Sequence, residues 1–221
     1  MEGARGMRLA ELSERSGVAP ATIKYYLREG LLPPGHRVTA TQADYDTAHL
    51  QRLKLVRALI QVGRVPVAAA KEVLAALEDD SLDHHSRLGV AVEALPNAPE
   101  PGPDDPHARA ARAAVDALID GLGWQYGGSD PEGSSGAYLT LLAAVTALTR
   151  LGYPCGTEEL AAYAAAAAQV AVADLDLVER YEAPAEQVEA AVALTVLYEP
   201  VLLSLRRLAQ AQESARRFVR P

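Results

Sequence analysis

The chain has 221 residues, of which 49% are hydrophobic and 23% are charged. This length and composition suffice for one large domain or two small ones and exclude wholesale disorder. The single cysteine, Cys155, excludes an intramolecular disulfide framework and a metal site built from several thiolates. Aromatic residues are only 5% of the chain, whereas alanine is abundant, which favours packed helices over a β-sandwich. We expect no membrane span, no secretory signal, and therefore a cytoplasmic protein.

The net charge of −8 argues at first against a nucleic-acid-binding protein, but the charge is unevenly distributed. Residues 1–78 carry 11 basic and 8 acidic side chains, a net charge of +3, whereas the rest of the chain carries 10 and 21, a net charge of −11. A mildly basic head on an acidic body is the distribution expected when only one end of a protein meets phosphate.

The first 80 residues predict a winged helix-turn-helix. A helix ends near Ser16, where Gly17 provides a stop, and a second helix begins at Pro20 and ends at Gly30. The connection of three or four residues between them is typical of a helix-turn-helix. The polar segment 35–44 predicts a two-stranded wing. Two further helices are expected over 47–62, with Asp46 as N-cap, and over 66–77.

The rest of the chain predicts a linker and an all-helical bundle. A short helix is expected over 82–95, and the five prolines of 96–106 indicate a linker. Helices then follow over 106–122, 137–151, 157–174 and 184–219. We expect Asp105 and Thr157 to be N-caps, the segment 121–136 to be a glycine-rich loop, and Pro200 to kink or split the last helix. The predicted domains are therefore 1–80, the linker region 81–106, and 107–221, and the fold class is mainly α.

The second helix of the head has one face suited to a DNA groove. Ile23, Tyr26 and Leu27 share the side expected to anchor the helix in the core. The opposite side carries a small residue, two cations and a phenol, which are Ala21, Lys24, Arg28 and Tyr25. Thr22 lies beside this face. Such groups can neutralise phosphates or reach base edges, and Arg37 and Thr39 could extend the contact from the wing. An ordinary solvated helix face would look similar.

Several motifs in order make the head more specific. Lys24-Tyr25-Tyr26 lies in the second helix, Gly30-Leu31-Leu32-Pro33 follows it, and Tyr45-Asp46 precedes Leu50-Gln51-Arg52-Leu53. Over about residues 8–77 this pattern resembles the DNA-binding domain of the MerR family. The resemblance implies a homodimer on a pseudo-palindromic promoter site in double-stranded DNA, with RNA polymerase as a partner in many members. It also implies DNA contacts from Thr22, Lys24, Tyr25 and Arg37.

The sequence departs from the family pattern at three places. Thr41-Gln42-Ala43 replaces the usual Gly-Tyr-Arg of the wing, and Ala19 stands where the second helix usually has a Ser or Thr N-cap. The long dimerisation helix that often follows the head is replaced by the short segment 82–95 and prolines. We therefore expect dimerisation to depend more on the C-terminal body.

The C-terminal body is expected to sense a signal, as the resemblance implies. One cysteine cannot build a thiolate metal site, and the adjacent His84 and His85 diverge on a helix, so we expect no metal and no cofactor. A small organic effector is the preferred hypothesis. Its candidate contacts are the aromatic residues of the body and one counter-charge for a cationic ligand, namely Trp124, Tyr126, Tyr138, Tyr153, Tyr163, Tyr198 and Glu199. These aromatics could equally be core or dimer-interface residues.

Three functions remain open at this point. The first is a ligand-responsive DNA-binding regulator. The second is a regulator without a small ligand, whose acidic body serves dimerisation or contact with a partner protein. The third is a protein that sequesters a toxic compound. No nucleophile–base pair, paired catalytic carboxylates or phosphate-binding loop is recognisable, so we expect no enzymatic activity.

Overall fold

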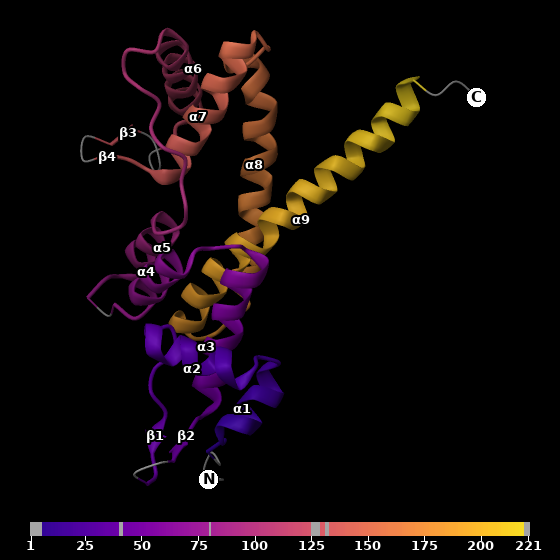
Figure 1. Cartoon of the computed structure of the whole chain (residues 1–221). Coiled ribbons are helices and arrows are strands. Elements are labelled where there is room, and N and C mark those ends of the chain that lie inside the picture. The colour runs from indigo at the N-terminus through magenta and orange to yellow at the C-terminus, as the bar shows by residue number, and fades with distance from the viewer. Residues whose placement is uncertain (1–5, 40–41, 80, 125–128, 131–132, 219–221) are drawn as a thin grey trace. The chain divides into compact units, whose positions relative to one another are not determined.

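The computed structural model describes residues 6–39, 42–79, 81–124, 129–130 and 133–218 (Figure 1). These residues form two compact units. The first combines the N-terminal segment up to Ala91 with the C-terminal segment from Val188, and the second is Val92–Gln187. This division differs from the expected one, which placed all of 107–221 in a single domain. The reason is that the last helix returns to the head, a long-range contact that has no local signature in the sequence.

The head of the first unit contains the expected elements. In chain order they are α1 (Leu9–Ser16), α2 (Pro20–Glu29), β1 (His36–Arg37), β2 (Ala43–Asp44), α3 (Thr47–Arg57), η1 (Ala58–Val62) and α4 (Val67–Leu77). The predicted helix over 47–62 changes at Ala58 into the π-helical segment η1. Gly17 and Gly30 end their helices in the left-handed conformation, with φ of 65° and 76°, which glycine adopts without a steric penalty.

The head buries one continuous apolar core. Leu12, Ile23, Leu53 and Val73 are fully buried and come from α1, α2, α3 and α4 in turn. The wing is an antiparallel pair in which His36 lies opposite Asp44, and Met7 adds a bridge to Tyr45. The predicted wing is therefore confirmed, and the chain N-terminal to α1 is tied to its base.

The helix α9 (Pro184–Phe218) divides into a buried and an exposed half. Val188, Val192 and Val196 are buried, and Val196 packs directly against the end of η1. A Cβ placed on Gly63 would lie only 2.0 Å from Val196 Cγ1. From Tyr198 to Phe218 almost every residue is exposed. Pro200 does not split the helix, since α9 runs through it without interruption.

The second unit is built from three packed helices, α6 (Pro106–Leu122), α7 (Gly136–Leu151) and α8 (Thr157–Val178). Asp105 caps α6 as predicted, by accepting a hydrogen bond from His107 N at 2.9 Å. The prediction for α8 was wrong: its N-cap is Gly156, because the Glu159 carboxylate accepts from Gly156 N and Thr157 is already helical. The short hairpin of β3 (Ser129–Asp130) and β4 (Gly133–Ser134) lies in the predicted glycine-rich loop.

The core of the second unit joins all three helices. Its buried members are Ala111, Val115, Leu118, Tyr138, Leu142, Val145, Leu160 and Ala164. Two of these members, Ala111 and Ala164, are alanines, whose small side chains allow helix backbones to approach closely.

The proline-rich segment is attached to this unit, and it is not a free spacer. It follows α5 (His84–Glu93). Ala98 N donates to Thr140 Oγ1 at 3.2 Å, and Arg112 donates to Glu100 at 2.7 Å. Glu93 accepts from Gly136 N at 2.7 Å and so fixes the start of α7. The prolines keep the segment extended, while these side chains hold it against α6 and α7.

Two helices are long and apolar enough to cross a bilayer, contrary to the expectation from the sequence. They are Thr157–Val178 and Glu186–Phe218, whose most apolar windows are 11% and 28% buried. Length and composition alone are weak evidence, since helices that pack in water-soluble proteins pass the same test. Both helices leave large apolar side chains exposed, such as Val172 and Leu175 in the first and Leu205 and Leu208 in the second.

The contact between α9 and the head can be tested at Gly63. We expect Gly63→Ala to destabilise the protein by about 1–3 kcal/mol, because its Cβ would lie 2.0 Å from Val196 Cγ1 and 2.9 Å from Leu59 O, although the φ of −73° at this position suits alanine. Val196→Ala in the same chain should restore part of this loss in a double-mutant cycle measured by chemical unfolding. Gly89→Ala is the matched control, since no atom lies within 4 Å of its Cβ. A loss from Gly63→Ala that Val196→Ala leaves entirely unchanged would show that α9 does not dock here.

Candidate nucleic-acid interface and ligand cavity

The helix-turn-helix is held by hydrogen bonds across its turn. Ser13 Oγ donates to Val18 O at 2.7 Å, and Val18 N donates to Ser16 Oγ at 3.2 Å. From α3, Arg57 donates to Ser16 O at 3.1 Å and lies where a side chain on Gly17 would be. These contacts fix the angle between α1 and α2, and hence the direction in which α2 presents its outer face.

The outer face of α2 carries the residues singled out in the sequence. Ala21, Lys24 and Arg28 are exposed, and Thr22 and Tyr25 are half-buried. The Arg28 guanidinium lies 5.2 Å from the centre of the Tyr25 ring, a cation–π distance.

The opposite side of α2 is anchored in the core. Ile23 is fully buried and Tyr26 is 4% exposed, and burial raises the pKa of the Tyr26 hydroxyl. The second helix therefore presents a positively charged face while its other side is fixed in the head, which is the arrangement needed to place cations against phosphate.

The wing carries the two remaining DNA-contact candidates. Arg37 and Thr39 are both exposed, and Arg37 Nε donates to Thr39 O at 3.4 Å. Arg8, which the sequence analysis did not identify, lies 3.2 Å from Asp44 and donates to Gln42 at 3.1 Å. Gln42 is one of the positions where the wing departs from the family pattern. Its partnership with Arg8 shows that the substituted wing is fixed to the start of α1.

A histidine–aspartate cluster, also not identified from the sequence, lies at the base of the wing. Asp46 caps α3, and its Oδ1 accepts from His49 N at 3.0 Å and from His49 Nδ1 at 2.7 Å. The second carboxylate oxygen lies 3.1 Å from His36 Nε2 on β1. The hydrogen bonds from the His49 side chain and backbone hold the pKa of the Asp46 carboxyl well below its usual range. One carboxylate thus joins the wing to α3.

The same cluster holds the residues that could ligate a metal. His36, Asp46 and His49 each place one ligand atom within 4.8 Å of the others. Two features oppose a cation there: the ligand atoms already pair with one another, and Asp46 lies at the positive end of the α3 dipole. We therefore interpret the cluster as a helix cap extended to the wing.

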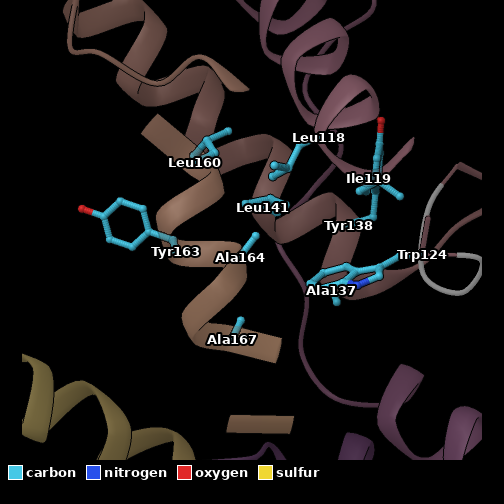
Figure 2. Close-up of a pocket in the computed structure, with 10 residues that line it drawn as sticks. All are labelled: Leu118, Ile119, Trp124, Ala137, Tyr138, Leu141, Leu160, Tyr163, Ala164 and Ala167. Carbon is cyan, nitrogen blue, oxygen red and sulfur yellow. The ribbon is translucent and has the colours of Figure 1, made fainter. Parts of the chain in front are cut away.

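The second unit contains an apolar cavity of about 300 Å³. Figure 2 shows its walls, which come from α6, α7, α8 and the residue Trp124 just beyond α6. The lining residues are Leu118, Ile119, Trp124, Ala137, Tyr138, Leu141, Leu160, Tyr163, Ala164 and Ala167. Trp124 and Tyr163 are 45% and 61% exposed, so both are accessible to solvent beside the cavity.

Tyr138 places its hydroxyl in a polar network behind the cavity wall. The hydroxyl donates to Asp116 Oδ1 at 2.6 Å and accepts from Arg112 at 3.3 Å. Burial, together with the neighbouring Asp116 carboxylate, raises the pKa of Tyr138 to about 12. The hydroxyl is therefore protonated at neutral pH, and its hydrogen bonds fix the ring as part of the wall.

The structure brings together only part of the predicted ligand set. Trp124, Tyr138 and Tyr163 line the cavity. Tyr153 follows α7, is 61% exposed and is not among the lining residues. Tyr198 and Glu199 belong to α9 in the other unit and are not among the lining residues. Tyr126 lies outside the described residues.

Comparison with known proteins agrees with this geometry. Residues 7–77 match the family model described as the MerR HTH family regulatory protein. The chain therefore carries a MerR-family helix-turn-helix domain at residues 7–77. Over 50 residues it is 36% identical to a MerR-type relative named as an HTH-type transcriptional regulator ZntR homolog from Haemophilus influenzae. That segment is 23% of this chain and 37% of the relative, so the similarity covers only the head.

A second similarity, to a solved structure, covers almost the whole chain. It is that of SCO5550 from Streptomyces coelicolor A3(2), described as a candidate transcriptional regulator, with 52% sequence identity and a TM-score of 0.80. The alignment covers 97% of this chain and 99% of the other. The α6–α8 unit and the returning α9 are therefore part of a fold shared with that protein.

The cap at the wing base predicts how the head responds to acid. We expect Asp46→Ala to destabilise α3 by about 1 kcal/mol, while Asp46→Asn, which still caps, costs less. Because the pKa of Asp46 is lowered in the folded head, its contribution is fully present above the unfolded value of about 3.9 and is lost progressively as pH falls from that value through the lower pKa of the folded head. Hydrogen exchange of the α3 amides at pH 5 and pH 2.5 measures this.

The asparagine variant is the matched control for charge. The difference between wild type and Asp46→Asn should be smaller at pH 2.5 than at pH 5. If the difference is the same at both pH values, the ionised carboxylate is not what joins His36 and His49.

Proposed function

We propose that this protein is a homodimeric transcriptional regulator that binds a pseudo-palindromic promoter site. It acts in the cytoplasm together with RNA polymerase. A small organic molecule bound in the second unit modulates its binding to DNA. The observation that carries the DNA-binding assignment is the outer face of α2. It presents Lys24 and Arg28 to solvent from a helix that Ile23 and Tyr26 fix in the core. Ala21 leaves room for close approach, Thr22 and Tyr25 add hydroxyl groups, and Arg37 and Thr39 extend the surface onto the wing.

The exposed half of α9 supports a dimer. Tyr198, Val201, Leu205 and Leu208 recur at the alternating spacing of three and four residues that a coiled coil requires, and they are 40–67% exposed. Water-soluble proteins seldom leave such a stripe open. A second copy of the same helix offers the identical stripe, so two chains can cover each other by a two-fold axis. The resemblance to a homodimeric family points to the same partner.

The cavity supports modulation by a ligand. Its volume of about 300 Å³ lies at the lower end of the range for small-molecule sites. Three of the aromatic residues proposed as ligand contacts line it, and they come from separate parts of the chain. An acidic body used only for dimerisation or for a partner protein would not need this cavity.

The DNA interface can be tested on a site selected from random-sequence DNA. We expect Lys24→Ala to weaken binding by about tenfold or more and to lower the slope of log affinity against log salt by about 1, because one phosphate contact is lost. Tyr25→Phe, which removes only the hydroxyl, should weaken binding less. Lys54→Ala is the matched control, because the same charge is lost from α3 beside Glu189. Footprints unchanged by both α2 variants would remove α2 from the interface.

The dimer can be tested by analytical ultracentrifugation of the full chain. Leu205→Lys with Leu208→Lys should raise the dimer dissociation constant by at least about a hundredfold, because each buried leucine contributes about 1.5–3 kcal/mol. Gln210→Lys adds the same side chain to the opposite side of α9 and should leave the dimer intact. A monomeric wild-type protein, or equal effects of the two changes, would contradict dimerisation through this stripe.

A further inference from the structure

We propose that the cavity of the second unit takes an uncharged molecule, mainly hydrocarbon, about the size of two fused rings. The inference rests on the proposed ligand control and goes further by naming the chemical class. This uncharged ligand also differs from the cationic ligand for which Glu199 was the expected counter-charge. The argument depends on which polar atoms the walls offer, on the charges near them, and on the space between α6, α7 and α8.

The walls offer a ligand almost no polar atoms. Seven of the ten lining residues are alanine, leucine or isoleucine. The Tyr138 hydroxyl is already engaged by Asp116 at 2.6 Å and Arg112 at 3.3 Å. In Figure 2 the hydroxyls of Tyr138 and Tyr163 both point away from the region between Ala137 and Ala164. The rings and aliphatic side chains are therefore what a bound molecule meets.

None of the described residues that line the cavity carries a carboxylate or a cationic group. The nearby Arg112 is paired with Glu100 at 2.7 Å, and Asp116 accepts from the protonated Tyr138. A charged ligand would lose its hydration without gaining a counter-ion, which costs several kcal/mol. Contact of a cation with the faces of Trp124 or Tyr163 returns only about 0.5–2 kcal/mol. The balance favours an uncharged molecule.

The volume sets the size of the ligand. An apolar cavity of about 150 Å³ accommodates one benzene ring, so about 300 Å³ accommodates roughly two rings. The room exists because Ala137, Ala164 and Ala167 stand at wall positions where larger residues would fill it. Ala167 is exposed and Ala164 is buried, so a larger residue at 167 reduces the cavity without overpacking the core.

The closing experiment uses three probes of one shape and the only tryptophan of the chain. Trp124 lines the cavity, and its fluorescence reports occupancy. The probes are the alcohol, the ammonium and the carboxylate derivatives of decahydronaphthalene, which do not absorb where tryptophan does. We expect the alcohol to bind at least about tenfold more tightly than either charged probe. Ala167→Leu should weaken it by about tenfold or more, and Ala165→Leu, the same change at an exposed position beyond the lining, should not.

The outcomes separate the ligand class from the ligand control. Preferential binding of the ammonium or the carboxylate probe, with the same sensitivity to Ala167→Leu, would overturn the uncharged class and leave ligand control intact. Failure of all three probes to bind would overturn the proposed class. If the alcohol binds but leaves the affinity for the selected DNA site unchanged, the class stands and ligand control of DNA binding fails.

Discussion

The close approach of α9 to the backbone at Gly63 is the constraint on which the first unit depends. The π-helical segment η1 ends there, Arg64 takes a positive φ of 54°, and Val65 N bonds back to Leu59 O at 2.9 Å. This turn leaves Gly63 open on one side, and Val196 occupies that side. Packing of the first half of α9 thus completes the core of a head that is otherwise only about 80 residues long, too small to bury a large fraction of its surface. It also determines that the apolar second half of the same helix is left uncovered.

The head could be predicted from the sequence because its signals are local. Gly17 and Gly30 mark the helix ends at which the backbone becomes left-handed, and Asp46 precedes α3 as an N-cap should. Each of these signals lies within a few residues of the structure it determines. The buried His49 could not be predicted in the same way. Its partner His36 is 13 positions earlier, and only the pairing of β1 with β2 places both imidazoles on one carboxylate.

In the second unit the helices could be predicted from the sequence, but the residues that line the cavity could not. Its helices follow from the periodicity, but the assignment of aromatic residues to a cavity depends on how the helices pack. Tyr138 and Tyr163 lie on helices that share the cavity, whereas Tyr198 belongs to a helix that packs with the head. Nothing local distinguishes them, since each is a tyrosine on an alanine- or leucine-rich helix. The proline-rich segment is a similar case: composition indicates a spacer, but Glu100 and Ala98 attach it to α6 and α7.

Arg52 connects the packing of α9 to the junction between α2 and the wing. Its side chain is only 14% exposed, its Nε donates to Leu31 O at 3.1 Å, and it pairs with Glu78 at 3.0 Å. Burial lowers its pKa, while Glu78 and Glu189 act in the opposite direction. These three partners come from the end of α2, the end of α4 and the start of α9. The Leu31 carbonyl lies between α2 and the wing, so one guanidinium joins this junction to the end of α4 and to α9. A buried cation can hold these elements together only while its partners remain in place, because the loss of a partner leaves a desolvated charge uncompensated.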